Sequence, residues 1–399
     1  MKEQLLTNYF KTAFKIQQTL KQKNIINVNF RSGPFVEVVG PVQENYQIHF
    51  EDTSNSSSVY STNINNGMWT AYGVKYFVPW RITIKSESYS NTIDLNLKNQ
   101  KVAIINESGS LGDTIAWMNS VKNFQEKHDC VVDYYTGLSE IFDKNYYNKI
   151  NFYNYNQVDV NKYLYVYKLG CFKPYGANEF CGKDWRSIRL NNVADEILGL
   201  SYGSNPPELI KTEPKQKIKK TVCIAIQSTA QAKYWNNNGG WQQVVGYLNN
   251  LDYEVICIDK DKTFGCENYF NTIPNNCLDK TGTIDLKERI QDLTNCDFFI
   301  GLGSGLSWLA WACKKPVILI SGFSSPDSEF YTPYRVHNDK VCNSCWNNPN
   351  HEFNSGDWLW CPEHKNDNKI FECTKQITFD MVKEKIDSCI RNLKNENFN

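Results

Sequence analysis

The hydrophobic residues of this chain follow two different spacings. Between residues 27 and 97, apolar and polar residues alternate in short runs such as FVEVV and YQIHF, separated by Gly, Pro, Asn and Ser. Alternation with a period of two predicts strands that bury one face, so a small antiparallel β domain resembling a barrel is expected here. A polar loop is expected at residues 52–58, and a helix over residues 1–24, where apolar residues recur near helical spacing.

From residue 101 onward, buried runs alternate with amphipathic ones in two successive series. In the first, KVAIIN predicts a strand, SGSLGD a loop, TIAWMNSVKNF a helix, and CVVDYY and YLYVY further strands. In the second, TVCIAIQS, YEVICID, DFFIGLG and PVILISG predict strands, and WQQVVGYL predicts a helix. Strands that alternate with helices indicate parallel sheets of the α/β class. Two such halves facing a cleft suggest the GT-B arrangement of two Rossmann-like domains.

A stretch rich in proline and charged residues, 205–215, separates the two series and has the composition of a linker. The predicted domains are therefore residues 1–98, with the helix and the β domain; residues 99–212, the first Rossmann-like domain; and residues 213–399, the second. A Cys-, Gly- and Pro-rich excursion near residues 170–184 is expected to be a hairpin in the first. An amphipathic helix over residues 377–393 is expected to close the second.

Composition and charge exclude several classes of partner. Lys and Arg together number 43, as do Asp and Glu, so no overall charge directs the chain to nucleic acid or anionic lipid. No apolar run approaches the ~20 residues that span a bilayer, and the first residues lack the apolar core of a signal peptide. The chain is therefore expected to be cytoplasmic and soluble, with no membrane span.

A glycine-broken loop opens the helix expected after DFFIGLG. In GLGSGLSWLAWA, residues 301–312, such a loop leaves backbone N–H groups at the positive end of the helix, where phosphate groups bind. The loop is therefore a candidate to hold the diphosphate of a donor, with help from the hydroxyls of Ser304 and Ser307. An ordinary tight turn between strand and helix is the alternative, and no GK[ST] follows to make a Walker loop.

Three further polar sites follow predicted strands, at the sheet edge where open α/β sheets bind ligands. Asp113, after SGSLG, is a candidate general base, or simply the cap of its helix. Lys233, with nearby hydroxyls such as that of Thr229, could offset charge on a leaving diphosphate, although a surface lysine is the common alternative. Asp259 could accept a hydrogen bond from a ribose hydroxyl or be a solvated loop residue.

The most specific spacing in the chain belongs to Cys342, Cys345, Cys361 and Cys373. In a reducing compartment this spacing indicates four thiolate ligands to one metal, with four unrelated cysteines as the alternative. The intervening segment is rich in Trp, Asn and Pro and has no periodicity, so a metal would be its main fold determinant. Four sulfurs suit a structural zinc or iron site. Cys171 and Cys181 could pair or belong to a second site.

Three motifs resemble a known family: SGSLGDT, STAQAKYW and GSGLSWLA are similar to the ADP-heptose glycosyltransferase superfamily, which includes the lipopolysaccharide heptosyltransferases. Four more, NGMWTAYGVKYFVPWRITI, DKVCNSCWNN, DWLWCP and FECTKQIT, resemble the bacterial autotransporter O-heptosyltransferases. The resemblance covers nearly the whole chain. It implies a cytoplasmic enzyme that moves heptose from ADP-D-glycero-D-manno-heptose onto serine hydroxyls of an autotransporter adhesin, with inversion. It also implies an iron-binding finger, a β-hairpin thumb and a large homo-oligomer.

Carried over by position, the resemblance implies that Asp113 is the catalytic base and that Lys233 contacts the diphosphate. Ser304, Gly305 and Leu306 match the loop that starts the donor-binding helix, and the four cysteines match the ligands of the finger iron. The sequence leaves two alternatives open. One is a transferase of the same fold with another donor sugar or acceptor, and the other is a non-catalytic, metal-binding assembly scaffold.

Overall fold

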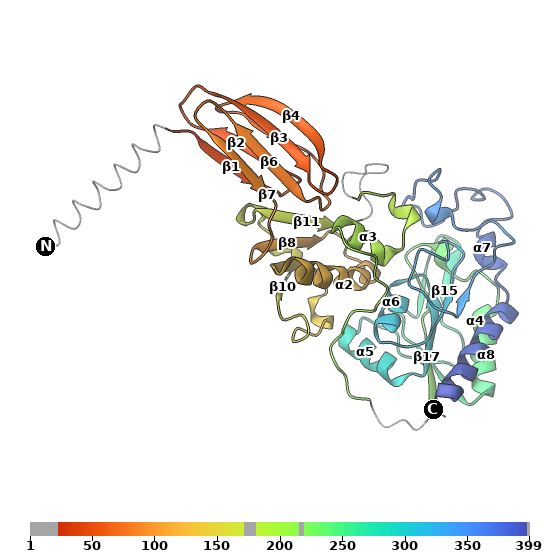
Figure 1. The fold of residues 1–399 in the computed structure, drawn as a ribbon. Helices are drawn as coiled ribbons and strands as arrows, with labels where there is room; N and C mark the ends of the chain where they lie inside the picture. The colour runs from red at the N-terminus through yellow and green to blue at the C-terminus, as the bar shows by residue number, and fades with distance from the viewer. Residues whose placement is uncertain (1–22, 171–180, 215–218, 397–399) are drawn as a thin grey trace.

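The computed structural model describes residues 23–170, 181–214 and 219–396 (Figure 1). The helix expected over residues 1–24 falls almost entirely outside these ranges, as does most of the excursion expected to be a hairpin near residues 170–184. Cys171 also lies outside them. None of the described helices combines the length and the apolar character that crossing a bilayer requires.

The N-terminal part of the described chain consists of two antiparallel sheets that share one hydrophobic core. One contains β1 (Ile25–Asn29), β2 (Phe35–Val39) and β5 (Trp69–Ala71), and the other contains β3 (Asn45–Asp52), β4 (Ser57–Asn65), β6 (Trp80–Lys85) and β7 (Ser90–Asp94). The predicted antiparallel strands are confirmed, but the described strands do not close into a barrel. The polar loop is also shorter than expected, because its two ends belong to β3 and β4.

The first α/β unit has a four-stranded parallel sheet in the order β10-β9-β8-β11. Its strands are β8 (Lys101–Asn106), β9 (Val131–Tyr135), β10 (Ile150–Tyr153) and β11 (Tyr165–Leu169), and its helices are α2 (Leu111–His128) and α3 (Leu190–Ile197). Short 3₁₀ helices are η1 (Ser139–Ile141), η2 (Tyr155–Gln157), η3 (Val160–Lys162) and η4 (Trp185–Ser187). The backbone of Phe30 bridges to β11 and joins the N-terminal sheets to this unit.

The second α/β unit has a six-stranded parallel sheet in the order β16-β13-β12-β17-β18-β19. Its strands are β12 (Lys220–Ile224), β13 (Tyr253–Cys257), β16 (Leu278–Asp279), β17 (Phe298–Leu302), β18 (Val317–Ile320) and β19 (Arg335–Val336), and a separate hairpin pairs β14 (Thr263–Cys266) with β15 (Tyr269–Thr272). Its helices are η5 (Gln231–Lys233), α4 (Gly240–Asn250), α5 (Leu286–Asn295), α6 (Gly305–Ala312), η6 (Cys345–Asn347), α7 (Glu372–Lys375) and α8 (Phe379–Glu396).

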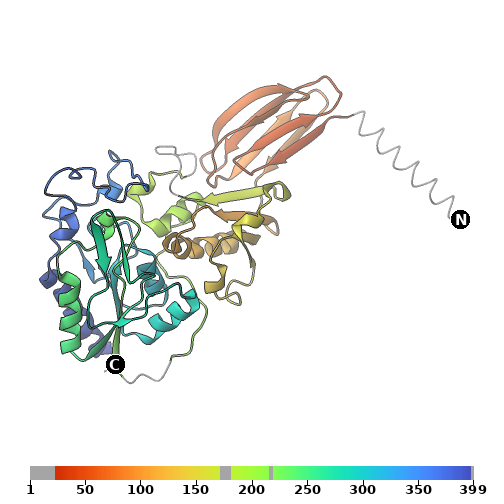
Figure 2. The same cartoon turned by 180° about the vertical axis from the view of Figure 1, so that it is seen from behind.

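The two α/β units share a core, because α2 of the first packs on α6 of the second (Figures 1 and 2). Trp117 of α2 and Trp308 and Leu309 of α6 are buried in the same cluster. The prediction of two successive α/β units with parallel sheets is confirmed. The domain boundaries at residues 98 and 212 stay predictions.

Candidate functional site

The two glycine-containing loops singled out in the sequence meet where the N-termini of α2 and α6 face each other. A Cβ atom on Gly305 would lie 2.9 Å from Cβ of Leu111 and 3.4 Å from the backbone N of Gly112. A Cβ atom on Gly112 would lie 3.1 Å from Cδ1 of Trp308. Position 305 therefore needs glycine, because a side chain there would collide with α2, and a side chain at position 112 would press on the ring of Trp308. Tertiary packing thus brings the predicted phosphate loop at the start of α6 against the N-terminus of α2, whose first turn contains Asp113.

Asp113 lies in the first turn of α2, and the cap of this helix is another residue. Ser110 is the N-cap, and its hydroxyl accepts a hydrogen bond from the backbone N–H of Asp113 at 3.1 Å. The alternative that Asp113 only caps its helix is therefore wrong. The carboxylate instead accepts a hydrogen bond from the Ser108 hydroxyl at 2.5 Å, and Asp113 as a residue is 6% exposed.

The environment of Asp113 suits a proton acceptor. Burial raises the pKa of Asp113, while the hydroxyls of Ser108 and Ser110 and the charge of Lys233 act in the opposite direction. Desolvation makes a carboxylate a stronger proton acceptor, while the hydrogen bonds and the cation favour its ionised form, and a general base requires both. Ser108 was not among the residues predicted from the sequence, although it lies in the same SGSLGD loop.

Lys233 ends η5, directly after the turn that follows β12. Its Nζ atom lies 3.5 Å from the Thr229 hydroxyl and sits over two aromatic rings, at 5.3 Å from the centroid of Phe323 and 5.8 Å from that of Trp346. Because its charge also lowers the pKa of Asp113, Lys233 acts across the junction between the two units. These contacts distinguish Lys233 from an ordinary surface lysine.

Of the two serines predicted to contact the diphosphate at the start of α6, only one has a hydroxyl that is not used within the turn. Ser304 is the N-cap, and its side chain makes no capping hydrogen bond. Ser307, in contrast, is fully buried and donates its hydroxyl to the backbone oxygen of Leu302 at 2.5 Å. The structure therefore assigns the Ser307 hydroxyl to the turn after β17, whereas a ligand contact was expected. Leu306 packs against the core that the two units share.

Asp259 is neither a solvated loop residue nor an open ligand site. Asp259 is 2% exposed. Its carboxylate oxygens accept hydrogen bonds from the backbone N–H groups of Ile226 at 2.6 Å and Gln227 at 3.2 Å. Burial raises the pKa of Asp259 to about 6. The carboxylate thus holds the turn that leads from β12 toward Lys233.

The four cysteines with ligand-like spacing belong to a loop segment that runs along the second unit, hereafter the finger (residues 342–373). Its packing is aromatic: Phe323 contacts Trp346 and Trp360, and Phe353 contacts both tryptophans at centroid distances of 4.8 and 5.2 Å. Cys361 and Phe371 are buried in the same cluster. The finger therefore has a small core of its own, which its lack of periodicity in the sequence did not predict.

The thiols of the finger influence one another, as the side chains of one donor set do. Burial is the main cause that raises the pKa of Cys373 to about 12, and the neighbouring Cys361 and Cys342 raise it further. Burial also raises the pKa of Cys345, and the other three cysteines of the set add to this effect. A nearby cation would offset both the burial and the repulsion between neighbouring thiolates, so these thiol ligands fit a metal that binds thiolates. Within the described ranges, however, no three or more His, Cys, Asp or Glu side chains lie close enough together to form a metal-binding group. Ligation by all four cysteines therefore stays a prediction.

The finger also joins the two α/β units beside Lys233. The ring of Trp346 contacts that of Trp185 in η4 at 5.0 Å. Asn347 donates to the backbone oxygen of Arg186 at 2.8 Å and accepts from the Ser328 hydroxyl at 2.7 Å. One short helix, η6, therefore contacts the first unit, the loop after β18 and the cation at the candidate site.

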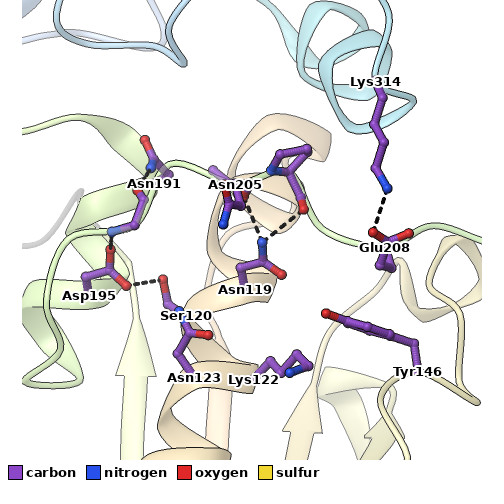
Figure 3. A pocket seen from close by; sticks show the side chains of 13 residues that line it. Asn119, Ser120, Lys122, Asn123, Tyr146, Asn191, Asp195, Asn205, Glu208 and Lys314 are labelled. Atoms are coloured by element: carbon purple, nitrogen blue, oxygen red, sulfur yellow. Dashed lines mark hydrogen bonds and ion pairs between the residues drawn. The ribbon is translucent and has the colours of Figure 1, made fainter.

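A separate pocket of about 450 Å³ lies along the linker and contains none of the predicted site residues (Figure 3). It is lined by polar residues of α2, by residues 203–208 and by Lys314. Asn119 donates to the backbone oxygens of Asn205 and Pro206, and Lys314 pairs with Glu208 at 2.6 Å. These contacts hold the linker to both units.

Comparison with known proteins identifies the family of this chain. Residues 193–357 match the model of glycosyltransferase family 9 (heptosyltransferase). The chain is 39% identical over 367 residues to the autotransporter heptosyltransferase Aah of Escherichia coli, covering 90% of this chain and 92% of that relative. The chain belongs to the autotransporter heptosyltransferase family. It is a glycosyltransferase of family 9, and the resemblance stated from its motifs is confirmed.

The fold of this heptosyltransferase agrees with a solved family structure. The heptosyltransferase TibC, from enterotoxigenic E. coli, has a TM-score of 0.87 and 34% identity, over 92% of this chain and 96% of that chain. The two share the GT-B-like fold. TibC is described as dodecameric and iron-containing, in complex with ADP-D-beta-D-heptose. A more distant relative, BimC of Burkholderia thailandensis, is 28% identical over 86% of this chain and 81% of its own length and is named inactive.

Proposed function

We propose that this protein transfers heptose from ADP-heptose to serine hydroxyls of an autotransporter adhesin, with inversion at the anomeric carbon. The observation that carries the proposal is that Asp113 lies in the first turn of α2, where the two glycine loops join the units, within reach of the charge of Lys233. A base and a cation on opposite sides of such a junction suit a reaction in which one group gains a proton while another releases an anion.

In the proposed reaction, Asp113 removes the proton from the acceptor hydroxyl, whose oxygen attacks the anomeric carbon from the side opposite ADP. A bond forms between that carbon and the serine oxygen, and the bond from the carbon to the diphosphate oxygen breaks. The electron pair leaves with ADP. Lys233 and the N-terminus of α6 stabilise the negative charge that develops on the diphosphate.

The remaining predicted residues are proposed to bind the donor or to shape its site. Ser304, Thr229 and the backbone N–H groups of Gly305 and Leu306 would contact the diphosphate. Asp259 would act indirectly, because its carboxylate is bonded to the backbone at the end of β12. Its predicted contact with the ribose is therefore replaced by a role in holding the turn.

The finger is proposed to hold one iron ion through Cys342, Cys345, Cys361 and Cys373. Four thiolates leave no open coordination position, so the metal would stabilise the loop and take no part in the transfer. Zinc fits the same donors. By analogy with TibC, a large homo-oligomer is also proposed, and the cytoplasm is proposed as the compartment in which the protein meets its acceptor.

The transfer reaction can be tested with the purified protein, ADP-heptose and an autotransporter passenger produced in its absence. The passenger is expected to gain mass in steps of one heptose, and fragmentation is expected to place the sugar on serine. Heptose found only on other side chains would show that serine is not the acceptor. Transfer from another nucleotide sugar but not from ADP-heptose would show that the proposed donor is wrong. No transfer from any sugar would favour the non-catalytic scaffold.

Replacement of Lys233 by alanine is expected to lower kcat by roughly 10²- to 10³-fold, the usual cost of losing one group that stabilises a developing anion. Steady-state kinetics with ADP-heptose would measure it, and KM for the donor is expected to rise as well. Lys219→Ala, an exposed lysine before β12, is the matched control and should behave as the wild type. Unchanged kinetics in Lys233→Ala would remove this residue from the mechanism.

Replacement of Ser108 by alanine is expected to move the acid limb of the activity profile to higher pH. The Ser108 hydroxyl stabilises the ionised form of Asp113, so its loss raises the pKa of the base further. Activity would then fall at a higher pH as the medium is acidified, with little change on the high-pH plateau. Measuring kcat/KM against pH checks this, and an unshifted limb would contradict the role of Ser108.

A further inference from the structure

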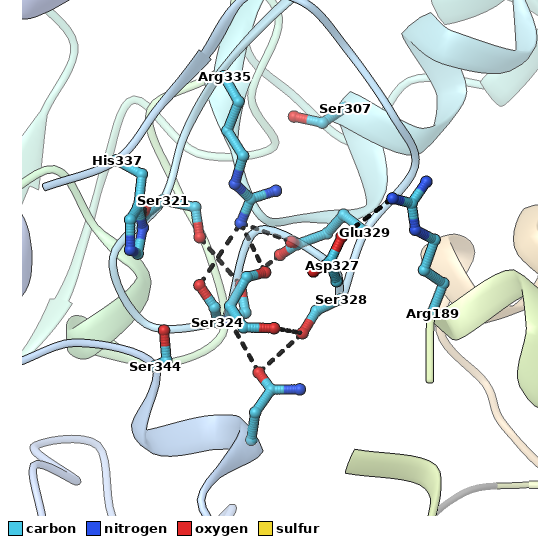
Figure 4. A network of polar contacts seen from close by, with 12 residues as sticks. Arg189, Ser307, Ser321, Ser324, Asp327, Ser328, Glu329, Arg335, His337 and Ser344 are labelled. Atoms are coloured by element: carbon cyan, nitrogen blue, oxygen red, sulfur yellow. Dashed lines mark hydrogen bonds and ion pairs between the residues drawn. The ribbon is translucent and has the colours of Figure 1, made fainter. Parts of the chain in front are cut away.

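A buried ion pair lies behind the loop that starts α6. Arg335 of β19 places Nη2 2.8 Å from Oε2 of Glu329, and the two side chains are 11% and 10% exposed (Figure 4). The Ser324 hydroxyl donates to Oε1 of Glu329, and the Ser321 hydroxyl lies 2.9 Å from that of Ser324. The free energy lost when two charges leave water cancels much of the free energy gained from their attraction. A contribution to folding stability is therefore a weak explanation for a buried ion pair.

This ion pair leaves some of its hydrogen-bonding capacity unused. The contact between Nη2 and Oε2 is short but is not aligned as a hydrogen bond. Among the described residues, Oε2 of Glu329 and Nε and Nη1 of Arg335 are buried without any hydrogen-bond partner. Buried polar atoms are usually paired, so unpaired ones concentrated at a single position indicate a partner that arrives from outside.

The position of the carboxylate relates it to the candidate donor site. A Cβ atom on Gly303 would lie 2.7 Å from Oε1 of Glu329 and 3.6 Å from the Ser321 hydroxyl. Glu329 therefore occupies the space that a side chain at position 303 would take. Gly303 immediately precedes Ser304, the N-cap of α6, so the carboxylate flanks the loop proposed to hold the donor diphosphate.

We propose that Glu329 determines the specificity for the donor sugar by accepting hydrogen bonds from its hydroxyl groups, while Arg335 holds the carboxylate in place. An ionised carboxylate only accepts hydrogen bonds and repels a diphosphate, so the part of an ADP-sugar that it suits is the hydroxyl-rich sugar. The inference rests on the proposed function, because it needs the diphosphate at the start of α6.

Calorimetric binding of ADP and of ADP-heptose separates the two parts of the donor. Glu329→Gln is expected to reduce the preference for ADP-heptose over ADP by roughly 10- to 100-fold, the usual range for a hydrogen bond to a charged group, with ADP affinity unchanged. Asp327→Asn is the matched control, because this carboxylate on the same loop is 84% exposed and pairs with Arg189 at the surface. It should keep the wild-type preference.

A second variant transfers the carboxylate from position 329 to position 303. Because a Cβ atom at position 303 falls so near Oε1, aspartate there would place its carboxylate in the space that Glu329→Ala vacates. The double variant Gly303→Asp/Glu329→Ala is therefore expected to recover much of the preference for ADP-heptose that Glu329→Ala loses.

The outcomes distinguish this inference from the proposed function. A folded Glu329→Gln protein that keeps the full preference for ADP-heptose would overturn the role of Glu329 and leave the proposed function standing. Loss of folding in both the Gln and the double variant would assign the ion pair to stability and also overturn it. Failure of the wild type to bind ADP or ADP-heptose would instead count against the proposed function, and the inference would fall with it.

Discussion

Replacement of Asp113 by asparagine is expected to lower kcat by roughly 10²- to 10⁴-fold, the usual contribution of a general base. The amide has nearly the same shape and cannot accept the proton of the acceptor hydroxyl. Because Ser110 provides the helix cap, the fold and the binding of ADP-heptose should survive. Single-turnover transfer to a passenger measures the rate, and calorimetry measures donor binding.

The matched control for this variant is Asp129→Asn at the other end of the same helix. Asp129 is exposed and adopts a left-handed backbone conformation that asparagine also tolerates, so the control should keep near-wild-type activity. Rapid transfer by Asp113→Asn would contradict the role of Asp113 as the base. Loss of donor binding would assign Asp113 to the donor site.

The pH dependence gives an independent test of Asp113. Burial raises the pKa of this carboxyl above its ordinary value, so the base becomes protonated, and activity falls, at a higher pH than for an exposed aspartate. The wild-type profile should therefore have an acid limb that descends as the pH drops through this raised pKa. In Asp113→Asn the residual activity should lack that limb.

Replacement of Cys361 by serine is expected to remove the metal, lower Tm and reduce solubility, with activity lost as a consequence. Cys361 is buried in the aromatic cluster of the finger, so loss of a thiolate there removes both a proposed ligand and part of the packing. Because Trp346 and Asn347 join the two units beside Lys233, a loosened finger should also weaken donor binding. Elemental analysis measures the metal content, thermal denaturation measures Tm, and native mass spectrometry measures the state of assembly.

The control for the finger is Cys266→Ser, an exposed cysteine on β14 outside the proposed ligand set. It should keep its metal and its Tm. A metal-free Cys361→Ser protein with wild-type Tm and activity would contradict a structural metal site. Metal loss that stops transfer while Tm and assembly stay unchanged would indicate a direct catalytic role.

The strands that the sequence did not predict lie at the edges of the sheets or outside them. β4, β5, β10, β16 and β19 are edge strands, and the β14–β15 hairpin stands apart from both parallel sheets. Along β4 most side chains are exposed or partly so, so its sequence, SSVYSTNIN, lacks the alternation of a half-buried strand. Hydrophobic periodicity reports burial, and a strand held mainly by backbone hydrogen bonds at an edge leaves little of it.

The sequence by itself determined the two α/β series, the two glycine loops and the residue types at Asp113, Lys233 and the four cysteines, because periodicity and local turn chemistry are written in consecutive residues. Only the tertiary structure decided that the two loops meet and that the Ser307 hydroxyl faces inward. It also placed Glu329 in the side-chain space of Gly303. Such contacts join residues from separate elements, and which of them touch depends on how helices and sheets pack across a shared core.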